Sequence, residues 1–244
     1  MSAEARPAFY ALARGGWRDY VTLLHPPYTL WHLSYVVIGA ALAPVWQPGR
    51  LGATLAAFFL AVGVGAHALD ELRGRPLGTL IPRWTLVALA VGSIVGATAI
   101  GIAAAVDFDL WLLAFIGFGA FVVCAYNLEL FGGRLHNDLS FALFWGGFPL
   151  LTGYFAGAET IRGGAVLAAL FATLLSLAQR RLSAEVRKVR RRATSVAGTL
   201  ELSDGHVEQL TPEALLRGPE AALQLLAAAS IALAVALVVL RVSP

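Results

Sequence analysis

Seven long apolar segments constrain this 244-residue chain more than any other feature of its sequence. A helix needs about 20 mostly apolar residues to cross the hydrocarbon core of a bilayer. Charged residues make up 14% of the chain, whereas a soluble domain carries about 25%. We therefore predict an all-α integral membrane protein, multi-pass in the cell (inner or plasma) membrane, with about seven transmembrane helices. The segments are residues 28–47, 51–69, 84–106, 110–129, 139–157, 162–180 and 220–240.

The distribution of basic residues predicts the orientation of these helices. With a cytoplasmic N-terminus and alternating spans, only Arg50, Arg162 and Arg241 of the 18 Lys and Arg residues lie outside. Cytoplasmic loops of membrane proteins carry such an excess of Lys and Arg, so we expect the N-terminus inside and the C-terminus outside. Basic loops facing an anionic leaflet also explain the pI of about 9.3. The expected partner is therefore the lipid bilayer and not a nucleic acid.

Three regions follow from this topology. Residues 1–180 would form a transmembrane bundle of helices 1–6, preceded by an amphipathic N-terminal segment. Residues 181–219 would form a basic cytoplasmic cap over the bundle, a helix followed by a hairpin, which could also dock a protein partner. The hairpin is predicted from Asp204-Gly205, a pair that favours a tight turn between strands. Residues 220–244 would form the seventh transmembrane helix.

Polar side chains gather at the cytoplasmic ends of the predicted helices. His67, Asp70 and Glu71 stand at positions i, i+3 and i+4, so they share one helix face. Ionisable groups at the membrane boundary are costly and usually face a cavity, so each one is a candidate for a site. The other candidates at these helix ends are Arg75, Tyr126, Asn127, Arg134, His136, Asp138, Gln179, Arg180 and Arg181.

These residue types suit a phosphate-bearing ligand. Carboxylates bind Mg²⁺, which also takes phosphate oxygens, and arginine binds phosphate through two parallel hydrogen bonds. Because two histidines accompany the carboxylates, zinc, iron or manganese would suit the same residues. We predict catalytic and metal-binding roles for His67, Asp70, Glu71, His136 and Asp138. We predict substrate binding by Arg75, Tyr126, Asn127, Arg134, Gln179, Arg180 and Arg181.

Charges at helix ends can also mark the water boundary, cap a helix or pair with one another. For Arg73, Arg83 and the run Arg187 to Arg192 we expect this simpler role, as solvated or lipid-facing charge. His25 and His206 are expected to be structural. The remaining histidine, His32, could line the same cavity, although a structural role is the simpler expectation. For the pairs His67 with Asp70 and His136 with Asp138, both interpretations stay open.

Four short stretches, taken in order, resemble the UbiA-type intramembrane prenyltransferases. The first is Leu23-Leu24-His25-Pro26-Pro27, followed by Ile38-Gly39-Ala40-Ala41-Leu42. The second is an acidic helix end followed by Arg75-Pro76-Leu77, and the third is Tyr126-Asn127. The fourth is Phe148-Pro149-Leu150-Leu151-Thr152-Gly153-Tyr154. No stretch is specific alone, but their order and spacing match the family over residues 20–182.

The resemblance implies a helical bundle whose cavity opens to the cytoplasmic side and to lipid. In the family, two Asp-rich motifs bind Mg²⁺ and an isoprenyl diphosphate, whose prenyl group is transferred to an acceptor. This chain departs from both motifs. Residues 66–74 fall on the first, where only Asp70 matches an aspartate and His67 replaces another. The sequence Gln179-Arg180-Arg181 stands where the second would begin.

Three functional interpretations follow. The first is an enzyme that acts on a prenyl diphosphate from the cytoplasmic side, with Arg180 and Arg181 able to neutralise the diphosphate in place of a metal. The second is a non-enzymatic membrane subunit or a lipid- or quinone-binding protein. The third is a metal-dependent membrane enzyme that uses the histidines and carboxylates in the same cavity. Whether the chain is an enzyme stays open at this point, because a shared fold does not fix a function.

Overall fold

The computed structural model describes residues 6–243, and most of them are helical. Each of the seven predicted apolar segments overlaps a helix or a helical rod built of shorter pieces, although the helix in the first ends at Leu42, five residues before the predicted end at residue 47. The elements are α1 (Trp17–Leu23), α2 (Pro26–Leu42), α3 (Pro48–Phe58), η1 (Phe59–Ala66), α4 (His67–Leu72), α5 (Arg83–Asp107), α6 (Leu112–Asn127), η2 (Phe131–Gly133), α7 (Asp138–Ala142), η3 (Leu143–Gly147), α8 (Phe148–Ala158), α9 (Gly163–Arg192), β1 (Thr199–Glu201), β2 (Val207–Gln209) and α10 (Pro212–Val242).

Five helical rods among the described residues are long and apolar enough to cross a membrane. They are Pro48–Leu72, Arg83–Asp107, Asp138–Ala158, Gly163–Arg192 and Pro212–Val242. The helix α6 is apolar but has 16 residues, and α2 has 17. The structure therefore confirms a mostly helical protein with apolar helices of membrane-spanning length, while the crossing by α2 and α6 stays a prediction.

Two of the rods contain a π-helical segment in the middle. The segment η1 joins α3 to α4, and η3 joins α7 to α8. Hydrogen bonds in a π-helix run from i to i+5, which widens the helix, and such segments are frequent at functional sites. Both segments hold two glycines, Gly63 and Gly65 in η1 and Gly146 and Gly147 in η3. These glycines let the neighbouring helices come close to the widened backbone.

Close contact of α2 with α8 forms the centre of the bundle. A Cβ atom added to Gly39 would lie 2.0 Å from the carbonyl oxygen of Leu150, and one added to Gly153 would lie 2.2 Å from that of Val36. The two backbones touch, which only glycine allows at these positions. Beside this crossing, the Trp31 indole donates a hydrogen bond to the Tyr35 hydroxyl at 2.6 Å, and both residues are fully buried.

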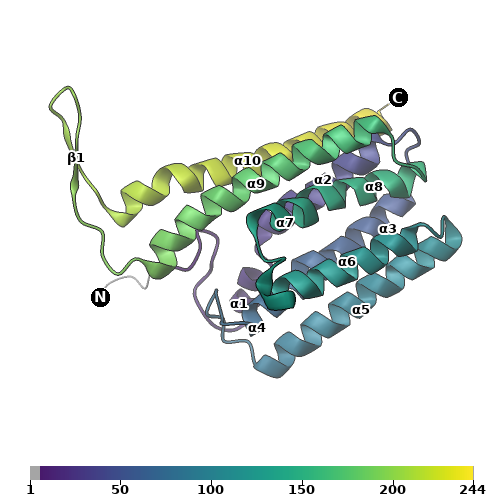
Figure 1. The fold of residues 1–244 in the computed structure, drawn as a ribbon, viewed down its shortest axis with the longest axis horizontal. Helices are drawn as coiled ribbons and strands as arrows, with labels where there is room; N and C mark the ends of the chain where they lie inside the picture. Colours follow the sequence, from purple (N-terminus) through teal and green to yellow (C-terminus); the bar gives the residue numbers. More distant parts are fainter. Residues whose placement is uncertain (1–5, 244) are drawn as a thin grey trace.

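The long helices α9 and α10 run side by side and carry the β-hairpin at one end (Figure 1). We call this the basic end of the molecule, because α9 finishes there with Arg190, Arg191 and Arg192. The strands β1 and β2 pair antiparallel around the predicted turn, and all their residues are exposed. The hairpin projects away from the bundle instead of lying over it as a cap. A protein partner at this segment stays a prediction.

Residues 7–24 cover the basic end in place of the hairpin. The Asp19 carboxylate holds this segment in place, because it accepts hydrogen bonds from the backbone N–H groups of Gly15 at 3.0 Å and Leu80 at 2.8 Å. On α9, the side chain of Arg191 donates to the carbonyl oxygen of Pro7 at 3.1 Å. The N-terminal segment is therefore tied both to the loop before α5 and to the last turns of α9.

Candidate functional site

A cavity of about 360 Å³ lies at the basic end, and we call it the polar cavity. Its walls come from residues 7–10, from α2, α4, α6 and η3, and from the last turns of α9. Seven of the sequence-predicted site residues line it. These are His67, Asp70, Tyr126, Asn127, His136, Gln179 and Arg180. The structure thus brings together polar residues from three helix ends that are far apart in the sequence.

One wall of the polar cavity is cationic. Arg187, Arg191 and Arg192 line it together with Arg180. Arg191 and Arg192 are also exposed, so solvated or lipid-facing charge stays the expectation for these two, whereas Arg187 is half-buried against the cavity. Gln179, Ser183, Arg187 and Arg191 recur at helical spacing and continue the inner face of α9 beyond the predicted span. This periodicity was the signal in the sequence that could have found them.

The lining of the polar cavity also includes histidines whose Nδ1 atoms are already bonded. His32 Nδ1 donates to the carbonyl oxygen of Trp145 at 2.7 Å, and His67 Nδ1 donates to that of Gly63 at 3.0 Å. His136 Nδ1 donates to the carbonyl oxygen of Tyr126 at 3.1 Å. A carbonyl oxygen only accepts, so Nδ1 carries a proton in each of these three rings.

The π-helical segments supply two of these carbonyl groups. Gly63 lies in η1 and Trp145 lies in η3. Carbonyl oxygens in the regular helices accept similar side-chain hydrogen bonds, such as that of Val123 from the Asn127 amide. His32 is bonded to Trp145 and its ring also lines the polar cavity, so both interpretations of this histidine stay open.

His25 lines the polar cavity as well. Its ring stacks on that of His67 with centroids 4.1 Å apart, and its Nδ1 shares a hydrogen bond of 2.8 Å with the Tyr10 hydroxyl. Burial raises the pKa of the Tyr10 phenol, so this hydroxyl stays protonated. Burial also lowers the pKa of the His25 imidazole well below its usual value, and neighbouring His67 lowers it further.

Several acceptor atoms in this region have no donor among the described residues. The Oε1 atom of Gln179 and the hydroxyl of Tyr126 are buried without a hydrogen-bond partner in the described part of the chain. The Asp70 carboxylate lines the cavity and takes part in none of the side-chain hydrogen bonds or ion pairs between described residues. Burying such atoms without a partner is costly, which makes each of them a candidate for ligand binding.

Two predicted site residues instead hold the loop between α4 and α5. The buried Glu71 carboxylate accepts hydrogen bonds from Leu77 N at 3.0 Å, Thr79 N at 2.8 Å and the Thr79 hydroxyl at 2.9 Å. The guanidinium of Arg75 donates to the carbonyl oxygens of Thr79 at 2.9 Å and Ile81 at 2.7 Å. Both side chains are engaged in this loop, and neither lines the polar cavity.

Asp138 and its neighbours lie at the rim of the cavity. The Asp138 carboxylate pairs with Arg180 at 3.2 Å and with Arg181 at 3.1 Å. The Arg181 side chain is 73% exposed, and it does not line the cavity. Arg134 is also exposed and outside the cavity lining.

The described residues do not fit a metal site built from two carboxylate motifs. Within residues 6–243, no three His, Cys, Asp or Glu side chains converge closely enough to hold a metal ion. Glu71 is occupied by the loop, and Asp138 is occupied by arginines. Asp70 is the only carboxylate among the cavity-lining residues of the described chain. Bound Mg²⁺, or another divalent metal, stays a prediction from the sequence.

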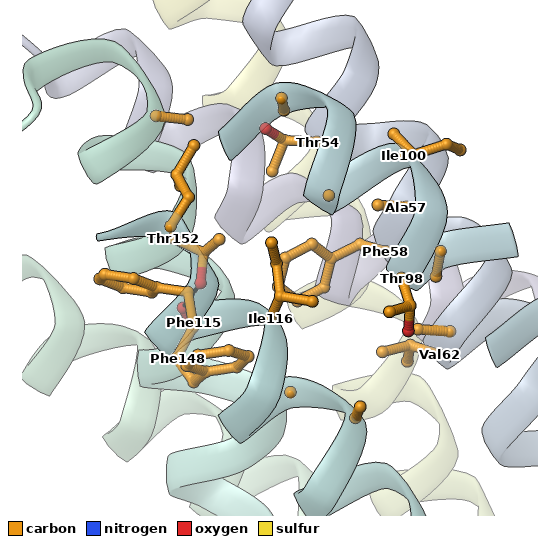
Figure 2. Close-up of a pocket in the computed structure, with 18 of the residues that line it drawn as sticks. Thr54, Ala57, Phe58, Val62, Thr98, Ile100, Phe115, Ile116, Phe148 and Thr152 are labelled. Carbon is orange, nitrogen blue, oxygen red and sulfur yellow. Dashed lines mark hydrogen bonds between the residues drawn. The ribbon is translucent and has the colours of Figure 1, made fainter. Parts of the chain in front are cut away.

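A second pocket of about 110 Å³, the apolar pocket, lies deeper in the bundle between the α3–η1 rod, α5, α6 and α8 (Figure 2). Phe58, Ile116 and Phe148 point into it. Trp145 lines both the apolar pocket and the polar cavity, so the two are neighbours with this buried side chain as a common wall. At its far end lies Arg50, whose guanidinium stands 4.3 Å from the centre of the Phe108 ring and pairs with Glu159 at 2.5 Å.

The fold and the two pockets define a class of protein. It is a mostly helical protein with apolar helices of membrane-spanning length and a polar cavity that meets an apolar pocket. No protein-family model, curated protein or solved structure matches this chain. The resemblance to the UbiA-type prenyltransferases therefore rests on the residues quoted above.

Proposed function

We propose that this protein is a membrane-embedded, UbiA-like prenyltransferase that takes a prenyl diphosphate from the cytoplasmic side. The observation that carries this proposal is the meeting of a polar, arginine-walled cavity with an apolar pocket at Trp145. A prenyl diphosphate has a matching division into an anionic head and an apolar chain. Its head would lie in the polar cavity, and its chain would lie in the apolar pocket.

The arginine wall supports binding of the diphosphate head. Guanidinium groups bind phosphate through two parallel hydrogen bonds and remain charged even when partly buried. Arg180, Arg187, Arg191 and Arg192 place four such groups along one wall. Because only Asp70 offers a cavity-lining carboxylate, we propose that these arginines neutralise the diphosphate in place of a protein-bound Mg²⁺ ion. Diphosphate binding should then persist in a chelating buffer.

The length and lining of the apolar pocket support binding of the chain. Along one rod the pocket runs from Arg50 to Val62, which is on the order of 18 Å at the rise of a helix. Its walls are alanines, glycines and aromatic rings, with Thr54, Thr98 and Thr152 among the lining residues. Burial of an apolar chain in such a pocket is favourable at about 25 cal/mol per Å².

An aromatic cluster lies where the two compartments meet. The Tyr126 ring is 4.6 Å from the Trp145 ring, and the Phe141 ring stacks on Trp145 at 5.8 Å. The allylic carbon of the substrate would lie beside these rings, whose faces attract a cation. In the proposed step the bond from this carbon to the diphosphate oxygen breaks, and the diphosphate leaves with the electron pair toward the arginines. The acceptor then bonds to the carbon, and the proton it loses passes to the released diphosphate.

Turnover of labelled prenyl diphosphates by the purified protein in detergent tests the proposal. Diphosphate release that requires an acceptor mixture and is abolished in Arg180→Ala and Asp70→Ala is the expected result. Absence of release with any chain length, together with a co-purifying lipid, quinone or protein, would favour the non-enzymatic alternative. Stoichiometric zinc or iron that is lost in His67→Ala would favour the metal-dependent alternative.

The proposed orientation has its own test. Cys124 is the single cysteine of the chain, so Cys124→Ser gives a background without native thiols. Ser203→Cys then places a thiol in the exposed hairpin, and Gly163→Cys places one at the opposite end of α9. In intact cells, an impermeant maleimide should label Gly163→Cys and not Ser203→Cys. The reverse pattern would overturn a cytoplasmic polar cavity.

A further inference from the structure

The outward face of α5 indicates where the hydrocarbon core of a membrane would begin. The helix has no charged residue between Arg83 and Asp107. Val87, Val91 and Val95 recur along one side at helical spacing, and all three are exposed. Trp84 stands one turn before them on the same side and is 74% exposed. Because tryptophan is enriched where a membrane meets water, Trp84 places this end of α5 at the membrane boundary.

The helix α1 is held at the same level as this boundary. The Asp19 carboxylate of α1 accepts its hydrogen bond from the backbone N–H of Leu80, four residues before Trp84. Leu80 itself is exposed. The helix lies beside α4 at the basic end (Figure 1). A side chain that points outward from α1 would therefore meet the headgroup region of a bilayer.

The two sides of α1 differ in chemistry. Asp19, Thr22 and Leu23 form its buried side. Trp17 and Tyr20 are exposed on the other side, with the exposed Arg18 between them. We call the exposed side chains of α1 and of the start of α5 the interfacial surface. It consists of Trp17, Arg18, Tyr20, Leu80, Arg83 and Trp84.

The exposed charge of this region has one sign. Residues 6–84 contain three acids, of which Asp19 and Glu71 are buried and Asp70 lines the polar cavity. Arg18 and Arg83 are both exposed. The positive headgroup of a zwitterionic lipid finds no exposed carboxylate here, whereas a negative headgroup finds two guanidinium groups.

We propose that the interfacial surface binds an anionic phospholipid, with Arg18 and Arg83 supplying the positive charge and Trp17 and Trp84 the amphipathic rings. Each arginine near an anionic leaflet strengthens such binding. The same N-terminal segment lines the polar cavity through residues 7–10, so the bound lipid also stabilises the cover of that cavity. This inference does not depend on the proposed enzymatic function.

Quenching by brominated lipids measures the preference. The full-length protein is reconstituted into nanodiscs with equal amounts of phosphatidylglycerol and phosphatidylcholine, and bromine is placed in the chains of one lipid or the other. The signal of Trp17 is the difference between the wild type and Trp17→Phe. We expect this signal to show a preference of about fivefold for phosphatidylglycerol. Equal quenching by the two lipids, or quenching by neither, would overturn the proposal.

Trp111 provides a matched control at the opposite end of α5. It is also 74% exposed, but it follows two acids, and its backbone N–H donates to the Asp109 carboxylate at 2.7 Å. Its signal, obtained with Trp111→Phe, should show no preference for phosphatidylglycerol. An equal preference at both tryptophans would mean that the protein attracts anionic lipid without a site, which would overturn the assignment.

Substitution of the arginine locates the site further. In Arg18→Gln the preference measured at Trp17 should fall from about fivefold toward one, because one of the two charges is lost. Arg162→Gln removes an exposed arginine before α9, far along the bundle, and should leave the preference unchanged. A preference that survives in Arg18→Gln would overturn the role given to Arg18.

Hydrogen exchange of the unmodified protein tests the same binding without a variant. A ligand that binds only the folded segment stabilises it. The backbone N–H groups of residues 19–24 should therefore exchange more slowly in nanodiscs that contain phosphatidylglycerol than in nanodiscs of phosphatidylcholine alone. Residues 108–112 should exchange equally in both. Equal rates for residues 19–24 would show that the lipid does not hold the segment.

Discussion

The polar cavity and the apolar pocket are neighbours, yet they are built in different ways. The cavity is defined by side chains held by individual hydrogen bonds, such as His32 to Trp145 at 2.7 Å. The pocket is defined by small residues and aromatic rings, such as Ala57 and Phe148. These side chains leave space for a ligand but offer it few hydrogen bonds. The same elements serve both, because α6 offers Val123 to the pocket and Tyr126 to the cavity. Within less than one turn of α6, the lining therefore changes from apolar to polar.

The largest expected effect is on the affinity for an anion, which should depend on the arginines of the polar cavity. We predict that the double variant Arg187→Gln, Arg191→Gln lowers the affinity for inorganic diphosphate about a hundredfold, or about 2.7 kcal/mol, because two charge-assisted contacts are lost. Calorimetric titration in the presence of a chelator measures this change. Lys188→Gln is the matched control, since its side chain is 72% exposed, and it should stay within about twofold. An unchanged affinity in the double variant would place the anion elsewhere.

Asp70 and Glu71 are adjacent carboxylates that should respond in opposite ways. Glu71→Ala leaves the N–H groups of Leu77 and Thr79 without their acceptor, so we predict a loss of unfolding free energy of about 2–4 kcal/mol. Asp70→Asn should change the free energy of unfolding by less than about 0.5 kcal/mol, while it lowers the release of diphosphate. Thermal unfolding of both variants in one detergent checks this. A strongly destabilised Asp70→Asn would show that Asp70 also holds the fold.

Changes in the apolar pocket should alter binding of the prenyl chain and leave binding of the diphosphate head unchanged. Ala57→Phe places a ring in the pocket, so we predict about tenfold weaker binding of a long-chain prenyl diphosphate and no change for inorganic diphosphate. Ala56→Phe is the control on the same helix, because Ala56 is exposed and does not line the pocket. Competition binding with diphosphates of increasing chain length measures the effect. Equal weakening of every chain length, inorganic diphosphate included, would contradict separate head and chain compartments.

The smallest effect concerns pH and the N-terminal segment that covers the cavity. The lowered pKa of His25 means that the unfolded chain binds more protons than the folded one at mildly acidic pH. Stability contributed by neutral His25 is therefore present above about pH 6.5 and is lost as the pH falls toward the lowered value. The slope of unfolding free energy with pH should be shallower in His25→Asn by at most about 1.4 kcal/mol per pH unit.

Asparagine suits this test because residue 25 has a φ of 46°, in the left-handed region that asparagine tolerates. Unfolding of both proteins from pH 7.5 to pH 5 gives the two slopes. Identical slopes would show that His25 does not couple the N-terminal segment to pH.

The positions of the helices could be predicted from the sequence, because an apolar segment of about 20 residues indicates a membrane-spanning helix. The chain from 28 to 240 contains apolar segments that the structure builds as helical rods, with the α9 rod continuing to Arg192. The π-helical segments could not be predicted, since Gly63 and Gly146 fit a regular membrane helix equally well. The close approach of α2 to α8 depends on which glycines face each other, and a single sequence does not contain that information.

The candidate site was predictable in part for a similar reason. His67, Asp70 and Arg180 are polar residues at apolar helix ends, and the structure places them in one cavity. Glu71 shows the limit of this reasoning, because its one-residue offset from Asp70 turns it toward the loop at Thr79. Arg187 and Arg191 line the cavity together with residues 7–10. The i, i+4 spacing from Gln179 to Arg191 indicates their shared helix face, whereas the contact with residues 7–10 is long-range and could not be predicted from a local pattern.

The η1 segment makes the site sensitive to the count of residues as well as to their identity. A π-helical turn holds one residue more than the α-helical turn beside it. Deletion of a single codon in the regular helix before it, Pro48–Phe58, would rotate everything after the deletion by about 100°. His67 and Asp70 would then face a different neighbour, although every functional side chain would still be present. Loss of one in-frame residue should therefore inactivate the protein while the apolar rod keeps a length sufficient to cross a bilayer.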